Sequence, residues 1–266
     1  MGFVFMAGTW FFLSLYLRLV FPVLLFITVL ISTRSAKNLP FFVKTTTVSK
    51  MKMSLTVAVL LVVILLDVLV IQGYFYSDEA VDMSFPLRNG KYCVIQGGNS
   101  RVTNFFHRFG ESEKYALDIA KLNGFGNRAK GLTPKKLLDY EIFGDAIFSP
   151  CDGTVIEVVD GLPDNVPHKF DIENPTGNHV IISCQEIRVL LAHMMRESVL
   201  VKEGDAVISG QGIGKVGNSG NTTEPHLHIS AVDNNDIGVL IAFHGKFLSL
   251  NSIFSNDVPT QTTTMN

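Results

Sequence analysis

Two long apolar runs near the start of the chain constrain its fold more than any other feature of the sequence. The first extends from Phe3 to Ser32 and is interrupted mainly by Arg18 and Pro22. The second extends from Leu55 to Ile71 and contains one charged residue, Asp67. A membrane-spanning helix needs roughly 20 apolar residues, and about 17 is the lower limit. Both runs reach that length, so we predict two membrane-spanning helices.

A signal peptide is the competing interpretation of the first run. The run lacks a basic start, and it is longer than the usual apolar core of a signal peptide. Arg18 and Asp67 are each costly in lipid, and we interpret them as residues that snorkel or face one another rather than as a transport site. If the first run did not span the bilayer, the second would act as a signal anchor, and the C-terminal part would still be exported.

The segment between the two runs, residues 33–53, is basic. It carries no acidic residue, and its five basic residues are Arg34, Lys37, Lys44, Lys50 and Lys52. Positive charge favours the cytoplasmic side of a membrane. We therefore predict helices within residues 1–32 and 54–73 and both termini outside. The chain is then a multi-pass protein of the inner or plasma membrane, with its C-terminal part on the periplasmic or extracytoplasmic side.

The part of the chain after residue 73 is acidic. Six of the 22 basic residues and one of the 24 acidic residues precede Tyr74, which leaves 16 basic against 23 acidic residues, a net charge of −7. A nucleic-acid-binding surface needs an excess of positive charge. The charge balance therefore argues against a nucleic-acid partner.

The chain contains three cysteines, Cys93, Cys151 and Cys184. None has a partner at the Cys-x-x-Cys spacing, so a cysteine-based zinc site is not expected. One pair could form in an exported domain, and an odd count leaves one cysteine over. The sequence does not assign a disulfide, and we interpret the cysteines as small buried hydrophobic residues.

Beyond residue 73 the sequence changes to short β-favouring runs separated by Gly, Asn, Asp and Pro. The runs are Tyr92–Gln96, Ala116–Ala120, Gly153–Val159, His179–Ser183, Val189–His193, Ser198–Val201, Gly214–Val216 and His226–Val232. Many short strands with frequent turns are typical of a sandwich or barrel. We therefore predict a mainly β fold, an antiparallel sandwich or barrel-like domain over residues 101–250. A stalk with a first strand at 74–100 would precede it, and a flexible tail at 251–266 would follow.

One segment of the exported part looks helical. It is Thr133–Tyr140, in which Thr133 is a suitable N-cap and Pro134 occupies the first helical position.

The segment Glu224–Ile229 contains two histidines, His226 and His228, two residues apart in a β-favouring context. Alternate side chains of a strand leave the same face, so both imidazoles should point into one site. A Gly-rich loop, Gly217–Asn221, leads the chain to this pair. A His-x-His strand can thus place a metal ligand beside a catalytic base.

A series of short motifs runs in order through the C-terminal part. They are Tyr115–Asp118, Ser149–Gly153, Gly177–Val180, Leu191–His193, Gly204–Asp205 with Gly210–Gln211, Gly217–Gly220 and Pro225–His228. With this series, the chain from about His107 to Val232 resembles the lysostaphin-like zinc metallopeptidases of family M23. These are cell-wall endopeptidases with the duplicated hybrid motif fold.

The resemblance implies a zinc ion held by an upstream His and Asp and by the second His of the His-x-His. The matching positions here are Asp118 and His228, with His107 as the candidate for the first ligand. The family commonly has its first His four residues before the Asp, where this chain has Lys114, a cation that would repel zinc. His107 is the only histidine that precedes Asp118, so residues 108–113 would have to loop back. Two His and one carboxylate form a normal catalytic zinc set with one position left for water.

The resemblance also implies that His193 and His226 take part in peptide hydrolysis. One of them would take the proton of the attacking water, and the pair would stabilise the oxyanion. No His-Glu-x-x-His motif occurs in the sequence, so a thermolysin-type site is not supported. We interpret His179 as a packing or rim residue, and His168 and His244 as surface residues.

The stretch from Lys121 to Asp145 is longer than the corresponding link in compact family members. We expect a loop beside the cleft that narrows the groove and selects substrate. A decorative insertion is the alternative.

Three functions are consistent with the sequence. The first is a membrane-anchored zinc endopeptidase that hydrolyses peptide cross-links of bacterial peptidoglycan, with the lipid bilayer as its second partner. The second is a degenerate family member that binds or regulates cell-wall hydrolases, and Lys114 is the only mark in its favour. The third is a phosphocarrier or lipoyl-like carrier domain, which an exported location disfavours. We favour the endopeptidase, and the sequence leaves open whether a regulatory protein partner is needed.

Overall fold

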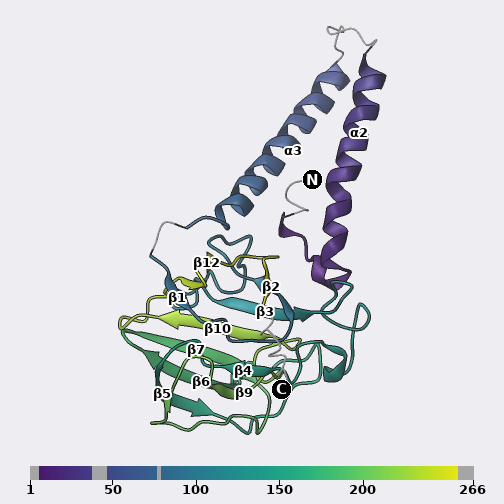
Figure 1. Cartoon of the computed structure of the whole chain (residues 1–266). Coiled ribbons are helices and arrows are strands. Elements are labelled where there is room, and N and C mark those ends of the chain that lie inside the picture. Colours follow the sequence, from purple (N-terminus) through teal and green to yellow (C-terminus); the bar gives the residue numbers. More distant parts are fainter. Residues whose placement is uncertain (1–5, 38–46, 77–78, 257–266) are drawn as a thin grey trace, which may run out of the picture.

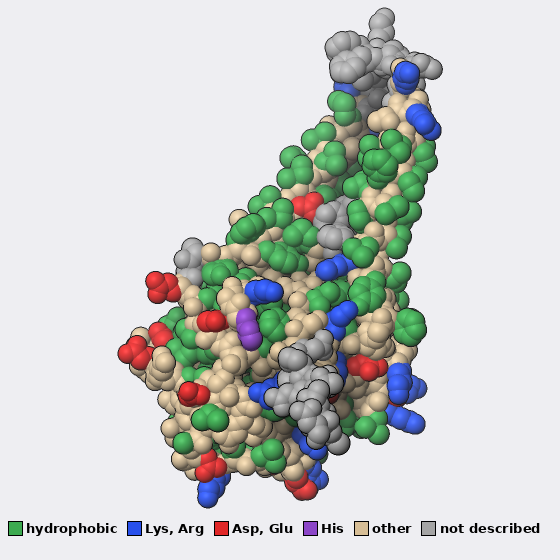
Figure 2. All heavy atoms as spheres, in the orientation of Figure 1, with side chains coloured by type: hydrophobic (Ala, Val, Ile, Leu, Met, Phe, Trp, Pro, Cys, Tyr) green, Lys and Arg blue, Asp and Glu red, His purple; other side chains and the backbone are tan. Residues whose placement is uncertain are grey.

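Two long helices project from one side of a β domain (Figure 1). The computed structural model describes residues 6–37, 47–76 and 79–256. Helix α2 covers Val20–Ala36 and helix α3 covers Thr47–Gln72. Residues 15–35 and 50–72 have mean hydropathies of 2.3 and 3.0 and are mostly exposed, so both are long and apolar enough to cross a membrane. On the face that Figure 2 shows, most of the coloured side chains along both helices are hydrophobic.

The first helix is shorter than the segment 1–32 in which we predicted it. Trp10–Phe12 and Leu15–Leu19 form two short 3-10 helices, η1 and η2, before α2 begins. Trp10, Phe11 and Leu15 are buried against the domain, so the apolar character of these residues serves tertiary packing. Residues 1–5 lie outside the described part of the chain.

The domain is mainly β and is built around one large sheet, as the sequence predicted. The sheet has eight strands in the order β13-β2-β3-β10-β7-β6-β5-β8, and all described pairs are antiparallel. The strands are β2 (Lys91–Gln96), β3 (Leu117–Leu122), β5 (Gly153–Val159), β6 (Asn178–Cys184), β7 (Ile187–Met194), β8 (Ala206–Val207), β10 (Leu227–Val232) and β13 (Ile253–Ser255).

Two smaller sheets complete the domain. Strand β4 (Ala146–Phe148) pairs with β9 (Gly212–Lys215). Strand β1 (Val81–Met83) pairs in parallel with β11 (Ile241–Phe243), which also pairs with β12 (Lys246–Phe247). The main core fills one face of the large sheet and includes buried side chains from β3, β7 and β10, among them Leu117, Leu191, Leu227 and Ile229.

A second, smaller core covers the opposite face of β2 and β3. It consists of Trp10, Phe11, Leu15, Cys93, Ile95, Ala120 and Leu122. Alternation along the strands explains the division, because Leu117 and Ile119 face the main core while Asp118 and Ala120 face the other way. The segment before α2 is therefore part of the domain.

The predicted helix over Thr133–Tyr140 is wrong. Only a single 3-10 turn forms, η3, at Leu137–Asp139. The backbone N–H of Lys130 donates to Asp139 at 2.8 Å, and Ala129 bridges to Tyr140. These two contacts close the segment into a short loop, and the backbone groups that make them are not available for two helical turns.

Other boundaries also differ from the predictions. The predicted strand at Ser198–Val201 is irregular backbone. The stalk contains β1, which pairs with β11, and the tail contains β13, which pairs with β2. Both pairings join segments far apart in the sequence. Neither β1 nor β13 shows strong alternation of apolar and polar residues, so the sequence did not indicate that they form strands. Residues 257–266 of the predicted tail lie outside the described part of the chain.

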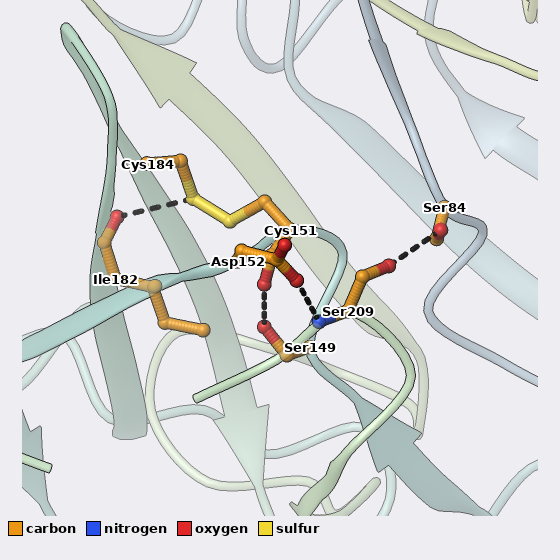
Figure 3. The surroundings of a disulfide bond; sticks show 7 residues. All are labelled: Ser84, Ser149, Cys151, Asp152, Ile182, Cys184 and Ser209. Carbon is orange, nitrogen blue, oxygen red and sulfur yellow. Dashed lines mark hydrogen bonds between the residues drawn. A yellow bond between two sulfur atoms is a disulfide. The ribbon is translucent and has the colours of Figure 1, made fainter. Parts of the chain in front are cut away.

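A disulfide joins Cys151, just before β5, to Cys184 at the end of β6 (Figure 3). The two Cα atoms are 6.1 Å apart. The Cys151 carbonyl also accepts a hydrogen bond from Ser149 Oγ at 2.7 Å. The sequence assigned no disulfide and left one cysteine over in any pairing; that cysteine is Cys93, which is free and buried.

Candidate active site and metal centre

Three adjacent strands carry the histidines and the aspartate of the predicted site. On β10, His228 lies opposite Asp118 of β3 on one side and opposite Ala192 of β7 on the other. His226 precedes His228 by two residues and shares its face, because Leu227 and Ile229 between and beyond them face the main core. The register alone thus brings together residues 110 positions apart in the sequence.

A β-bulge turns His193 into the same site. Leu191 faces the main core, so simple alternation would also send His193 there. The register of β6 and β7 shifts between Asn178 and Val180, and His193 has a φ of 60°. Such a bulge re-aims a side chain, and here it places the imidazole 4.8 Å from that of His226, measured between ring centroids. A left-handed backbone at a non-glycine residue is often found at a functional site.

His107 reaches the site from a loop between β2 and β3. Its Nε2 atom lies 3.4 Å from Asp118 Oδ1. Residues 100–108 wind into a turn in which Asn104 N–H donates to Ser100 O and Arg108 N–H donates to Asn104 O. The chain thus loops back between His107 and Asp118, which are eleven positions apart, as the prediction for His107 required.

His107, Asp118 and His228 form a set of donors that fits a metal ion. One donor atom from each lies within 4.8 Å of the other two. Asp118 Oδ1 is 3.0 Å from His228 Nδ1 and 3.4 Å from His107 Nε2. Tetrahedral zinc with bonds near 2.0–2.1 Å places its ligand atoms roughly 3.4 Å apart. Two nitrogens and one carboxylate oxygen at this spacing are the donor set that zinc prefers.

Hydrogen bonds to the second nitrogen of each imidazole support this fit. His107 Nδ1 lies 2.8 Å from Asn104 Oδ1, and His228 Nε2 lies 3.0 Å from Glu113 Oε2. Both partners are oxygen acceptors, so in a neutral imidazole the proton sits on the nitrogen that faces away from Asp118. The nitrogen that faces Asp118 is then free to bind a metal. The sequence analysis did not identify Asn104 or Glu113.

His193 and His226 are held in an equivalent way. His193 Nδ1 donates to Ser219 O at 2.9 Å, and His226 Nδ1 donates to Glu224 O at 2.8 Å. In each neutral imidazole, Nε2 is left as the basic atom. His226 Nε2 lies 3.4 Å from Asp118 Oδ1, beside the donor set.

The Gly-rich loop positions the carbonyl that holds His193. A Cβ at Gly177 would collide with the backbone of Ser219, and a Cβ at Gly220 would collide with the backbone of Gly177. Both glycines also have positive φ angles, 61° and 88°. The close approach of these two backbone segments therefore needs glycine at both positions.

Electrostatic coupling separates the protonation states within the cluster. Burial alone would raise the pKa of Asp118, but the neighbouring imidazoles, with His107 and His226 foremost, outweigh it and hold that pKa well below its usual range. Burial, followed by the charges of His226 and His228, lowers the pKa of His193. Burial opposes a charge on His226, yet the Asp118 carboxylate raises the pKa of that imidazole. Of the two imidazoles beside the donor set, His193 is therefore more readily neutral than His226.

These residues line a cleft of about 900 Å³. Several separate segments form its walls, and they include Thr9 and Phe12, Phe106 and Gly110, His168 and Phe170, Pro175 and Thr176, and Asn221–Glu224. The loop from Lys121 to Asp145, which we expected beside the cleft, contributes no residue to the lining within the described chain. The segment before α2 takes part in the wall instead.

Arg128 connects that segment to the residues that precede β10. Its side chain is 2% exposed and binds Glu224 in a bidentate manner, with Nε–Oε1 at 2.8 Å and Nη2–Oε2 at 2.6 Å. Its guanidinium lies 3.9 Å from the ring centroid of Phe12, and its backbone N–H donates to Phe11 O. Since Glu224 O accepts from His226, these contacts run from the segment before α2 to the site.

The other histidines lie apart from the donor set. His179 is buried and bonds to Gly177 O and Glu157. His244 is exposed, and His168 is an exposed residue at the rim of the cleft that bonds to Pro134 O. Lys114 lies over the Tyr115 ring and pairs with Glu111 rather than facing the donor set.

Comparison with known proteins identifies the family of this domain. Residues 134–237 match the profile of peptidase family M23. The chain carries a domain of peptidase family M23. No curated protein matches the chain significantly.

Several solved structures resemble the M23 domain. Lysostaphin is 21% identical over 45% of this chain and 36% of its own length, with a TM-score of 0.29. An M23 peptidase from Pseudomonas aeruginosa is 25% identical over 48% of this chain and 40% of its own, with a TM-score of 0.30. A zinc-containing peptidase from Vibrio cholerae is 20% identical over 47% and 48%, with a TM-score of 0.29. The chain therefore spans less than half the length of each of these proteins.

Proposed function

We propose that the chain is a membrane-anchored zinc endopeptidase that hydrolyses peptide cross-links of bacterial peptidoglycan. The observation that carries this proposal is the convergence of five side chains in one cleft. Three of them, His107, Asp118 and His228, form the candidate metal-binding set, and two, His193 and His226, lie beside it with Nδ1 bonded to a backbone carbonyl. A domain that had lost catalysis would not need all five.

Zinc bound to the three ligands would supply a water of lowered pKa and would polarise the scissile carbonyl. Asp118 would neutralise part of the charge at the site. His193 Nε2 is suited to take a proton from the attacking water, because burial and its neighbours keep this imidazole neutral. His226, whose pKa the Asp118 carboxylate raises, is suited to donate a hydrogen bond to the developing oxyanion.

The placement of charge supports the membrane topology that the sequence predicts. Lys and Arg side chains gather at the end of α2 and α3 that lies far from the domain (Figure 2). Basic residues favour the cytoplasmic side, so the domain would lie on the extracytoplasmic side. The disulfide between Cys151 and Cys184 agrees with this location, because disulfides persist in oxidising compartments.

The substrate class follows from the family and the location together. Peptidoglycan, which consists of glycan strands cross-linked by short peptides, lies outside the bacterial membrane, and the resemblance to lysostaphin-like peptidases implies its cross-links as the target. A cleft of about 900 Å³ could accept a branched peptide.

The test is digestion of purified peptidoglycan by the full chain in detergent, with mass analysis of the released fragments. We expect new peptide ends that require zinc, vanish with a chelator and are absent for His228→Ala. A chain that binds zinc at one equivalent yet releases no fragment would overturn the peptidase proposal and favour a regulatory module. A chain that binds no zinc would overturn the metal site as well.

A further inference from the structure

Three phenylalanines are exposed in the loop that carries His107. Phe105, Phe106 and Phe109 are 53%, 72% and 68% exposed. The Phe105 ring lies 5.5 Å from the rings of both Phe106 and Phe109, measured between centroids. The three side chains thus form one apolar cluster that the domain itself does not bury. Clusters of this kind mark contact surfaces.

The turn that carries these residues has two different sides. It is held by the hydrogen bonds from Asn104 N–H to Ser100 O and from Arg108 N–H to Asn104 O. Asn104 is fully buried and His107 is 11% exposed at its side chain, and the two are joined at 2.8 Å. The turn therefore presents a metal-binding histidine inward and the phenylalanines outward.

The loop packs against the end of α3. Asn99 N–H donates to Gly73 O at 2.9 Å, and Asn99 Nδ2 donates to Phe75 O at 3.1 Å. The side chains of Ser100 and Thr103 fill the space that a Cβ at Gly73 would occupy. Since α3 ends at Gln72, the aromatic loop begins where this apolar helix enters the domain (Figure 1).

The chemistry of the surroundings fits a membrane interface better than a protein groove. Phe75, which follows α3, is 68% exposed and adds to the apolar surface beside the helix. Arg101 is exposed and lies 5.6 Å from the Phe109 ring centroid. Aromatic rings at the headgroup level, with cations that reach anionic lipid, are the usual composition of segments that lie at a bilayer surface.

We propose that Phe105, Phe106 and Phe109 insert into the interfacial layer of the bilayer that α2 and α3 span. This inference rests on the membrane anchoring in the proposed function. Phe106 also lines the cleft, so the lipid-facing surface and the wall of the cleft are continuous. The cleft would then open next to the membrane surface, and its substrates would be peptides held close to the bilayer, such as newly attached strands.

The test uses the full chain reconstituted in vesicles, with and without lipids brominated in their acyl chains. Each chain carries Trp10→Phe, so that one introduced tryptophan is the only fluorophore of its kind. Phe109→Trp reports the aromatic loop. Leu200→Trp is the matched control, because Leu200 is 71% exposed and lies beside β9, on the side of the domain away from the helices (Figure 1). Phe105→Trp serves if the first variant does not fold.

We expect a blue-shifted emission for Phe109→Trp that brominated lipid quenches by about twofold or more, with no change for the control. Water-like, unquenched emission from a chain recovered in the vesicles would overturn the inference while the anchoring stands. A blue-shifted emission that brominated lipid leaves unquenched would also overturn it and assign the surface to a protein partner. A chain that does not float with the vesicles would overturn the anchoring and the inference together.

Discussion

His228 Nε2 lies 3.0 Å from the Glu113 carboxylate, while the Nδ1 atom of the same ring lies 3.0 Å from Asp118. Glu113 also accepts a hydrogen bond from Ser230 Oγ at 3.3 Å, which fixes the carboxylate against β10. The ring is therefore held in one orientation from its outer side. An acceptor at this position also makes the imidazole a more basic ligand.

Glu113→Ala should weaken zinc binding about 10- to 100-fold, the usual cost of losing a hydrogen-bond partner of a metal ligand. Glu113→Gln should retain most of the affinity, because its amide oxygen can still accept from His228. Competition with a fluorescent chelator measures the affinity of each variant. Glu111→Ala is the control, since Glu111 is 77% exposed in the same loop and pairs with Lys114 alone in the described structure. Equal zinc affinity for the two alanine variants would remove Glu113 from the site.

Variants at Asp118 and His193 should distinguish the loss of metal binding from the loss of turnover. Asp118→Ala should lose zinc and activity together, because it removes one of the three proposed ligands. His193→Asn should keep zinc and lose about 100-fold or more in turnover. Asparagine suits this position, since it tolerates the φ of 60° better than alanine does. Zinc content by mass spectrometry, measured beside fragment release, tests both. Full zinc occupancy in Asp118→Ala would refute the ligand set.

Several strands of the large sheet could be predicted from sequence because their signals are local. Gly153–Val159 was predicted with its observed bounds, and Tyr92–Gln96 and His226–Val232 each within one residue. In each case a β-branched or aromatic run lies between turn residues. The His-x-His spacing also gave the common face of His226 and His228, since alternation is a property of a single strand.

The remaining features depend on non-local contacts. His193 lies in the cleft because of a bulge between β6 and β7, and strand alternation alone would place it on the core face. The role of Glu113 follows from its distance to His228, a residue 115 positions away. The segment around Trp10 is as apolar as a membrane helix, so composition could not show that it packs on β2 and β3. The pairing of Cys151 with Cys184 likewise could not be predicted, because it depends on how β5 and β6 pair.

The buried ion pair between Arg128 and Glu224 should be important for stability. Arg128→Gln leaves the Glu224 carboxylate, 13% exposed, without its partner, and should lower the free energy of unfolding by about 3–5 kcal/mol. The double variant Arg128→Met/Glu224→Met should recover part of this loss, because no lone charge stays buried. Thermal unfolding in detergent ranks the variants by stability.

A surface pair provides the comparison for Arg128. Arg188 and Asp236 are 36% and 77% exposed at their side chains. Asp236→Asn should change stability by less than about 1 kcal/mol. If Arg128→Gln were no more destabilising than Asp236→Asn, the contacts from Phe12 through Arg128 to Glu224 would not support the site.

The Cys93 thiol should report whether the segment before α2 covers the domain. Cys93 is completely buried, it packs in one cluster with Trp10, Phe11 and Leu15, and burial raises its pKa to about 12. With the other two cysteines paired, it is the one thiol available to an alkylating reagent. In the folded full chain it should stay unlabelled at pH 8, because it is both inaccessible and protonated.

Phe11→Ser should speed the labelling of Cys93, whereas Leu13→Ser should not. Phe11 is 4% exposed within the cluster, and Leu13, two residues further, is 51% exposed. Mass spectrometry of timed samples gives the two rates, and thermal unfolding shows that both variants are folded. Equal protection in both would mean that Phe11 does not cover β2. If the rates differ as expected, a soluble fragment that begins at Tyr74 would have an open thiol and would lack Phe12 from the cleft wall. Activity measured on such a fragment would then understate that of the whole chain.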